Sequence, residues 1–130
     1  MLTAAPMKRA LVVEDDPDIV ELIDHYLKTE GFEVEALGDG RQALERLQGG
    51  GHDVVILDLQ LRSGTGLGVL KAMHDWRTGI PRTAIVFTNY GFPQYRDRAL
   101  ALGAQHFFDK ARDLEALRGV TEVGDDLCDR

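Results

Sequence analysis

Short hydrophobic runs recur along the chain, and each has the length of a β-strand. The runs predicted as strands cover residues 10–13, 32–37, 54–57, 84–87 and 106–108. Between them, apolar residues recur three and four positions apart, which is the spacing of a helix with one buried face. The helices predicted from this spacing lie at about 17–30, 43–47, 67–76, 94–102 and 112–120. Each predicted strand is therefore followed by a helix.

This alternation predicts the fold class. Strands that each lead into a helix pair in parallel through crossover connections, with helices on both faces of the sheet. Hydrophobic runs rich in β-branched residues, such as Val54–Leu57, fit strands that are buried on both faces. We expect one α/β domain over residues 8–124, built on a doubly wound parallel sheet. An N-terminal arm of residues 1–7 and a C-terminal tail of residues 125–130 flank it.

Composition and charge narrow the range of partners. The 130 residues include 15 Lys and Arg against 22 Asp and Glu, which gives a net charge of −7. Because the basic residues are scattered rather than gathered in one stripe, binding to nucleic acid or to an anionic membrane is disfavoured. The single cysteine, Cys128, fits a free thiol in a reducing compartment. The N-terminal apolar run is too short for a signal peptide or a membrane span, so we expect a cytoplasmic protein.

Polar side chains follow four of the predicted strands, at the point where each strand ends. In chain order they are Glu14-Asp15-Asp16, Asp58, Thr88 and Asp109-Lys110. In open α/β sheets the ligand site lies beyond the carboxyl ends of the strands. We therefore expect these side chains to meet in one site.

The residue types at these strand ends favour a particular chemistry. Several carboxylates in one pocket repel one another unless a cation is present, and Mg²⁺ with its oxygen ligands suits Glu14, Asp15 and Asp58. A phosphoryl group carried by one carboxylate would share this metal. Lys110 would supply a positive charge to the phosphoryl oxygens, and Thr88 a hydrogen bond. The set can make and hold an acyl phosphate.

Taken singly, each of these residues also has a structural interpretation. Asp16 before Pro17 fits a helix N-cap, and Asp18 fits a charge that favours the helix dipole, so both are left outside the site. Roles in turns or on the surface also fit the members of the predicted site, Glu14, Asp15, Asp58, Thr88 and Lys110. The prediction depends on their joint arrangement.

With these motifs in place, the chain resembles a response-regulator receiver domain from about Lys8 to Gly119. The resemblance rests on four motifs in order: Val12–Pro17, Ile56–Leu61, Phe87-Thr88, and Gly103-Ala104 leading to Phe107–Lys110. It implies a flavodoxin-like (βα)5 fold with strand order 2-1-3-4-5.

The resemblance also implies a role for each matching residue. Asp58 is similar to the phosphoacceptor, Glu14 and Asp15 to the metal-binding acidic pair, Thr88 to the switch hydroxyl and Lys110 to the lysine of the family's site. The backbone carbonyl of Gln60 is expected to ligate Mg²⁺ as well. Residues expected to modulate access to the phosphoryl group are Gln60, Asn89 and Tyr90.

Phe107 corresponds to the switch aromatic of the family. Phosphoryl oxygens are expected to pull Thr88 inward, which vacates space for Phe107 to rotate and remodels the surface of the fourth helix, fifth strand and fifth helix. The alternative for Phe107 is plain core packing, because an aromatic residue on a strand buries area in any case.

Three positions depart from the family pattern. Arg62 stands where receivers usually have proline, Ala111 replaces the proline that usually follows the lysine, and Asn89 replaces a small residue after the switch threonine. The loss of the Lys-Pro pair leaves the rigidity of the last loop open. The chemistry is expected to survive, while rates and the output surface are expected to differ from the family average.

The leading interpretation is therefore a phosphorylation-controlled signalling domain of a two-component system. Its phosphodonor would be a histidine kinase or a histidine phosphotransfer protein, and the chain would assist its own phosphorylation and dephosphorylation rather than act as an enzyme. We expect a monomer or a phosphorylation-dependent dimer. Because no residues remain for a DNA-binding domain, we expect output through contact with a downstream protein target or through a phosphorelay.

Three alternatives remain beside this interpretation. A phosphatase of the haloacid dehalogenase type also uses an Asp nucleophile after a strand, but needs a second acid where this chain has Gln60. A flavin-binding electron carrier would place a phosphate where Glu14, Asp15 and Asp16 repel it. A receiver-like interaction module whose binding ignores phosphorylation is the third.

Overall fold

A computed structural model describes residues 8–76, 81, 83–89, 91–113 and 115–117. Strands and helices alternate along this part of the chain, as the hydrophobic pattern predicts. In order they are β1 (Lys8–Val13), α1 (Pro17–Thr29), β2 (Phe32–Leu37), α2 (Gly40–Gln48), β3 (Val54–Leu57), α3 (Gly66–Trp76), β4 (Thr83–Thr88), α4 (Pro93–Ala101) and β5 (His106–Asp109). Residues 115–117 form a further helical turn.

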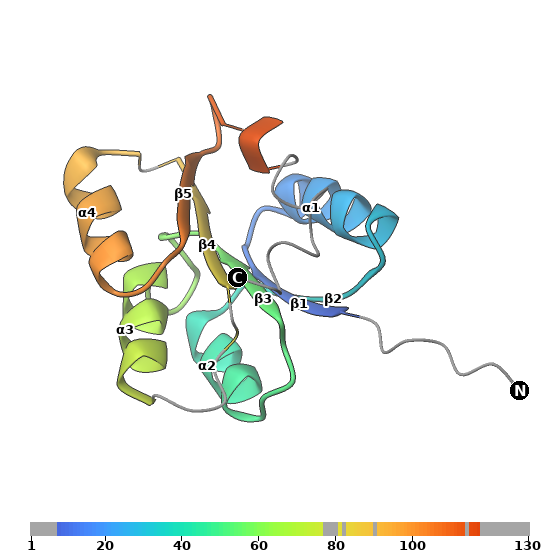
Figure 1. The fold of residues 1–130 in the computed structure, drawn as a ribbon, viewed down its shortest axis with the longest axis horizontal. Helices are drawn as coiled ribbons and strands as arrows, with labels where there is room; N and C mark the ends of the chain where they lie inside the picture. The colour runs from blue at the N-terminus through green and yellow to red at the C-terminus, as the bar shows by residue number, and fades with distance from the viewer. Residues whose placement is uncertain (1–7, 77–80, 82, 90, 114, 118–130) are drawn as a thin grey trace, which may run out of the picture.

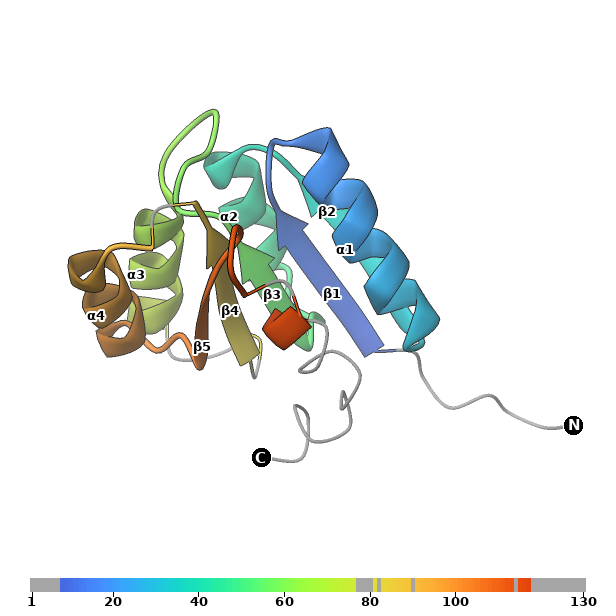
Figure 2. The ribbon, with the colours of Figure 1, turned by 90° about the horizontal axis from the view of Figure 1, so that it is seen from above.

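The strands form one five-stranded sheet in the order β2-β1-β3-β4-β5. Every neighbouring pair is parallel, and the register places Val12 beside Ile56 and Ile56 beside Ile85. Helix α1 and residues 115–117 lie on one side of the sheet, and α2, α3 and α4 lie on the other (Figures 1 and 2). The predicted fold class and strand order are confirmed.

The three central strands are buried on both faces, and this divides the hydrophobic core into two layers. On the α1 side, the strands present Val12, Ile56 and Ile85, which pack with the α1 residues Ile23 and Leu27. On the opposite side, the strands present Leu11, Val55 and Val86. These side chains pack with residues of α2, α3 and α4, which include Leu47, Leu70 and Ala99. Each large aliphatic side chain buried in this way contributes roughly 1.5–3 kcal/mol. Burial on both faces explains why these strands are continuously apolar in the sequence.

The strand boundaries differ from the hydrophobic runs where polar residues continue the sheet. β2 and β3 have the predicted limits, whereas β1 begins two residues earlier than its apolar run. Arg9 belongs to β1 because Asp53 holds it on both sides: the Arg9 N–H donates to Asp53 Oδ2 at 2.8 Å, and the Asp53 N–H donates to the Arg9 carbonyl at 2.7 Å. The polar residues that extend the later strands are Thr83, Thr88 and Asp109.

The first two helices begin at aspartate caps. The Asp16 side chain accepts a hydrogen bond from the Asp18 N–H at 2.9 Å, and Pro17 occupies the first helical position. This confirms the N-cap interpretation of Asp16 and leaves Glu14 and Asp15 at the end of β1. Asp39 caps α2 in the same way through the Arg41 N–H at 2.8 Å.

The C-terminal region is described only in part. Arg112 lies in a turn rather than in the predicted helix over 112–120, and helical structure is described at residues 115–117. The remainder of that helix, the arm (1–7), the tail (125–130) with Cys128, and Tyr90 lie outside the described residues.

Candidate functional site

The parallel sheet brings the predicted site residues to one edge through backbone hydrogen bonds that continue beyond the strands. The Asp58 N–H donates to the Val13 carbonyl at 3.0 Å, which places the residues after β3 and β1 side by side. The Lys110 N–H donates to the Thr88 carbonyl at 2.9 Å, which does the same for β5 and β4. The site residues therefore follow the ends of strands that are neighbours in the sheet.

Both oxygens of the Asp58 carboxylate accept hydrogen bonds. The Thr88 hydroxyl donates to Oδ1 at 2.6 Å, and the Lys110 ammonium donates to Oδ2 at 2.8 Å. The backbone N–H of Gln60 also donates to Oδ1 at 3.3 Å. Asp58 is 6% exposed and Thr88 is 0% exposed. The carboxylate thus lies at the boundary between the core and the outer edge of the sheet.

Lys110 links two buried carboxylates. Its Nζ lies 2.8 Å from Asp58 Oδ2 and 2.6 Å from Glu14 Oε1. Burial by itself lowers the pKa of Lys110, but hydrogen bonds and attraction from Asp58 and Glu14 outweigh it and raise that pKa. Lys110 therefore stays a cation.

For Glu14, the effect of burial on the pKa outweighs the effect of its hydrogen bonds. Burial raises its pKa, and the negative charge of Asp58 adds to that effect. Hydrogen bonds from the Lys110 ammonium and from the Asp16 N–H, the latter at 3.1 Å, lower the pKa without cancelling the increase. One ammonium between two carboxylates leaves the centre negative, and a further cation would relieve this repulsion.

Three carboxylates of this site could hold a metal ion. Single oxygens of Glu14, Asp15 and Asp58 all lie within 4.8 Å of one another. Glu14 and Asp58 are buried, whereas Asp15 is exposed. An all-oxygen set that is open on one side fits a hard divalent cation such as Mg²⁺, which retains several water ligands.

The loop between β3 and α3 carries Gln60 and folds back on itself. Gln60 forms an antiparallel bridge with Thr65, and the Gly66 N–H donates to the Leu59 carbonyl at 3.0 Å. A Cβ atom at Gly66 would collide with the carbonyl oxygen of Asp58. Gly66 is the buried first residue of α3, one position before the predicted start of this helix, and only glycine allows this approach to the phosphoacceptor candidate.

The loop that contains Ala111 is held by hydrogen bonds of two aspartates, Asp109, which the sequence analysis placed at the end of a strand, and Asp113, which it did not single out. Asp109 Oδ1 accepts from the Ala111 N–H at 2.7 Å, and Asp113 Oδ2 accepts from the Asp109 N–H at 2.8 Å. The Asp113 N–H donates back to the Asp109 carbonyl at 2.8 Å. These bonds hold the loop that carries Lys110. The signal in the sequence is the frequency with which Asp binds backbone N–H groups in turns.

The remaining predicted residues lie at the margin of the site. Asn89 is exposed directly after β4, and Phe107 is half-buried and packs against the core layer under α3 and α4. This packing fits the structural interpretation of Phe107, and its role as a switch stays a prediction.

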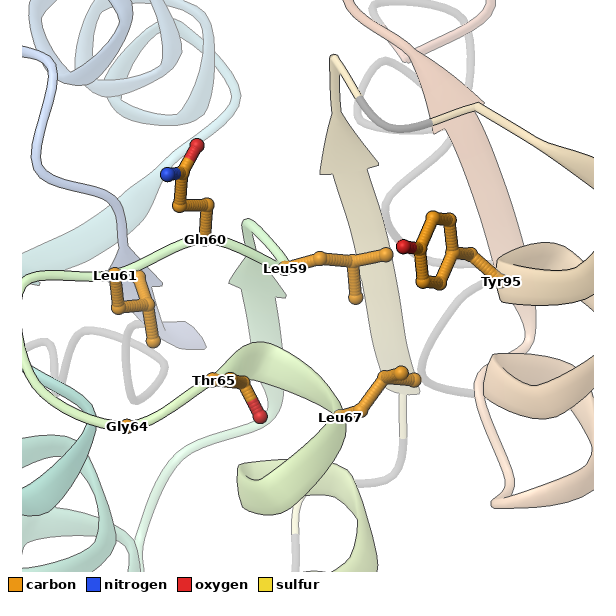
Figure 3. Close-up of a pocket in the computed structure, with 7 residues that line it drawn as sticks. All are labelled: Leu59, Gln60, Leu61, Gly64, Thr65, Leu67 and Tyr95. Atoms are coloured by element: carbon orange, nitrogen blue, oxygen red, sulfur yellow. The ribbon is translucent and has the colours of Figure 1, made fainter.

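A partly apolar hollow of about 350 Å³ lies beside the β3–α3 loop. Figure 3 shows Leu59 and Tyr95 facing one another across it, with Leu67 below. The hollow connects the loop that carries Gln60 to helix α4.

Among the described residues, no helix combines the length and hydrophobicity that a bilayer-spanning segment requires.

Two curated relatives match most of the chain. It is 33% identical over 109 residues to the transcriptional regulatory protein TcrA of Mycobacterium tuberculosis, which covers 84% of this chain and 42% of TcrA. It is 34% identical over 127 residues to the sensory transduction protein RegX3 of Mycolicibacterium smegmatis, which covers 95% of this chain and 54% of RegX3. The chain thus spans about half the length of these relatives.

Solved structures match the fold over nearly the whole chain. The response regulator TrrA of Thermotoga maritima, in complex with Mg(2+)-BeF, superposes with a TM-score of 0.75 at 30% identity, over 93% of this chain and 99% of TrrA. A CheY-like receiver domain protein of Methanospirillum hungatei gives a TM-score of 0.80 at 25% identity, over 94% of this chain and 97% of its own. The family model described as the response regulator receiver domain matches residues 10–122. The chain belongs to the response regulator receiver domain family.

Proposed function

We propose that this chain is the phosphoacceptor domain of a two-component signalling system and that Asp58 receives the phosphoryl group. The observation that supports the proposal is the set of contacts that the Asp58 carboxylate makes. This carboxylate is held by the Lys110 ammonium on one oxygen and by the Thr88 hydroxyl on the other, with two further carboxylates beside it. No other described carboxylate has this combination of contacts.

Mg²⁺ is the cofactor in this proposal. Glu14, Asp15 and Asp58 would hold it through carboxylate oxygens, with the backbone carbonyl of Gln60 as a further ligand. The all-oxygen donor set supports the assignment, as does the related TrrA structure, which is a complex with Mg(2+)-BeF. The metal, when bound, supplies positive charge to the oxygens of the phosphoryl group.

The chain's own residues account for acceptance of the phosphoryl group. An Asp58 oxygen attacks phosphorus while the nitrogen–phosphorus bond of a phosphohistidine donor breaks, and the departing imidazole takes up one proton. Lys110 and Thr88 then exchange their bonds to the carboxylate for bonds to the phosphoryl oxygens, which keeps the new negative charge hydrogen-bonded. The same residues would assist dephosphorylation, in which water attacks phosphorus, the bond from phosphorus to the Asp58 oxygen breaks, and phosphate leaves as the carboxylate forms again. The chain turns over no separate substrate in this proposal.

The movement of Thr88 provides the signal. Thr88 is fully buried and ends β4, the strand that pairs with β5, so its displacement towards a phosphoryl group would open space beside the strand that carries Phe107. Rotation of Phe107 into that space would change the surface formed by α4 and β5. Gln60 and Asn89, both exposed next to the site, and Tyr90 would modulate access to the phosphoryl group.

The partners in this proposal are proteins. A histidine kinase or a histidine phosphotransfer protein donates the phosphoryl group, and a downstream protein reads the changed surface, through a monomer or a phosphorylation-dependent dimer. The net charge of −7 over the 130 residues supports a domain, proposed at residues 8–124, that does not bind nucleic acid itself, although relatives are named as transcriptional regulators. The proposal includes a cytoplasmic location, which the single cysteine of this sequence, Cys128, favours because a reducing compartment keeps a thiol unpaired.

Phosphorylation with a small donor tests the proposal. We expect acetyl phosphate with Mg²⁺ to add one phosphoryl group to the chain, detected by intact mass, and the Asp58→Asn variant to remain unlabelled. Asp75→Asn is the matched control, because Asp75 is an exposed carboxylate on α3 that pairs with Lys71 at 3.2 Å. Undiminished labelling of Asp58→Asn would refute the assignment.

A second measurement separates this function from a phosphorylation-independent interaction module. Beryllofluoride with Mg²⁺ mimics the phosphoryl group, so we expect it to shift the NMR signals of residues in α4 and β5. A shift confined to the Asp58 site, with α4 and β5 unchanged, would favour the interaction module. Steady release of phosphate from a phosphomonoester would instead favour a phosphatase.

A further inference from the structure

Arg62 lies in the β3–α3 loop and reaches across to the residues that follow β2. Its backbone N–H donates to the Gly38 carbonyl at 3.3 Å, and its side-chain Nε lies 3.5 Å from the same oxygen. A Cβ atom at Gly38 would lie 2.9 Å from a terminal nitrogen of the guanidinium. The absence of a side chain at Gly38 therefore makes room for the Arg62 guanidinium, and the shared carbonyl keeps it there.

Arg62 and Gly38 line a hollow of about 400 Å³ between α1, the end of β2 and the β3–α3 loop. Glu14 and Asp15, two of the three carboxylates that could hold a metal ion, line the same hollow. The other acidic residues in its wall are Glu21 and Asp24. Among the described residues that line it, Arg62 alone is basic.

The two cations near the metal ligands differ in how far their charge is neutralised. Lys110 is buried and lies within 2.8 Å of one carboxylate oxygen and 2.6 Å of another. Arg62 is exposed, and within the described part of the chain it hydrogen-bonds to a neutral carbonyl and pairs with no carboxylate. No described carboxylate therefore neutralises the positive charge of Arg62 at the wall of the hollow, and this charge can act on a cation that enters it.

We propose that Arg62 lowers the affinity of the site for Mg²⁺. The inference rests on the metal site of the proposed function and concerns the strength of binding. A divalent cation that approaches Glu14 and Asp15 is repelled by the guanidinium through open solvent. For a separation of roughly 10 Å in water, Coulomb's law with screening gives an effect of roughly two- to fourfold in the dissociation constant. Arg62 is a residue that tunes affinity from outside the ligand set.

Calorimetric titration of the full chain with MgCl₂, without a phosphodonor, tests this role. Arg62→Gln removes the charge but keeps the backbone N–H that bonds to Gly38, and we expect its dissociation constant for Mg²⁺ to fall roughly two- to fourfold at low ionic strength. Arg62→Lys keeps the charge and should bind Mg²⁺ as the wild type does. Arg62→Glu should tighten binding further. The gain in both charge-changing variants should shrink at high salt, because salt screens charges across solvent.

Arg41→Gln is the matched control. Arg41 is an exposed arginine at the start of α2 that does not line the hollow, so the same loss of one charge should leave Mg²⁺ affinity unchanged. Equal tightening in Arg41→Gln would show an effect of net charge and overturn the role of Arg62. Unchanged or weaker binding in Arg62→Gln, while the wild type binds Mg²⁺, would also overturn it and leave the proposed function intact. A wild type that binds no Mg²⁺ overturns the metal site itself and this inference with it.

Discussion

The Lys110 ammonium donates a hydrogen bond to Asp58 Oδ2 at 2.8 Å, although 52 residues separate the two in the chain. The same nitrogen lies 2.6 Å from Glu14, so one cation joins the ends of β1, β3 and β5. This places a positive charge at the carboxylate that we propose as the phosphoacceptor. It also makes Lys110 the group that holds two buried negative charges together while no metal is bound.

Replacing Lys110 tests this second role. Lys110→Ala leaves the Asp58 and Glu14 carboxylates buried without their cation, and loss of one partner of such a pair costs about 3 kcal/mol. We expect urea unfolding without metal to show a loss of this order, and MgCl₂ to restore part of it because the metal takes over the neutralisation. Lys71→Ala, at an exposed ion pair on α3, should change the stability by less than about 1 kcal/mol. Equal stability of Lys110→Ala and the wild type without Mg²⁺ would contradict this account.

Thr88 separates phosphorylation from switching. Thr88→Val keeps the shape of this fully buried side chain but removes the hydroxyl that donates to Asp58 at 2.6 Å. We expect labelling by acetyl phosphate to continue at a reduced rate, while the NMR response of Phe107 to beryllofluoride is lost. Thr88→Ser, which retains the hydroxyl, should preserve that response. The interpretation of Phe107 as a switch is wrong if Thr88→Val responds as the wild type does.

Gly66 tests how tightly the β3–α3 loop packs on the site. A Cβ atom at Gly66 would collide with the Asp58 carbonyl oxygen, so Gly66→Ala should displace α3 or Asp58 and destabilise the fold by about 1–3 kcal/mol. Gly68→Ala is the control from the same helix. Gly68 is exposed, and its added Cβ would meet only the Thr65 hydroxyl at 3.3 Å, so a change below about 1 kcal/mol is expected. Similar losses in both variants, measured by urea unfolding, would argue against the specific collision.

Glu35 gives the stability of the fold a dependence on pH away from the site. Its carboxylate lies 2.7 Å from Arg46 Nε and 3.2 Å from His52 Nε2. Burial by itself raises the pKa of Glu35, but hydrogen bonds from His52 and Arg46 outweigh it and leave the pKa below its usual value. A pKa lowered by folding stabilises the folded state above the pKa of the unfolded chain, and this contribution is lost as the pH falls through the folded value.

We therefore expect Glu35→Gln to lower the free energy of unfolding at pH 7. The difference in this free energy between the variant and the wild type should narrow once the pH falls well below the usual glutamate pKa of about 4.3. The measurement is the midpoint of urea unfolding at several pH values. Glu33→Gln is the control, because Glu33 is an exposed residue of the same strand. A constant difference between Glu35→Gln and the wild type at all pH values would contradict the expected linkage.

The sequence by itself determined the sheet and which polar residues lie near one another at its edge. Continuous apolar runs such as Val54–Leu57 identify strands that are buried on both faces, and their alternation with helices requires parallel pairing. Parallel strands end at the same edge, so residues such as Asp58 and Thr88 that follow them had to lie near one another. The aspartate cap of α1 could also be predicted from the sequence, because Asp16 and Pro17 act locally within the first turn of the helix.

Only the tertiary structure decided which side chains bond to one another at that edge. Lys110 pairs with both Asp58 and Glu14, which lie far from it in the sequence. The contact of Arg62 with Gly38 also joins distant segments, and Gly66 approaches the Asp58 carbonyl oxygen because the loop between them folds back. Polar residues such as Arg9 entered strands because partners in other loops completed their backbone hydrogen bonds. Hydrophobic periodicity records which face of a segment is buried, whereas these contacts depend on register, loop path and side-chain rotamer, which are fixed when the layers pack together.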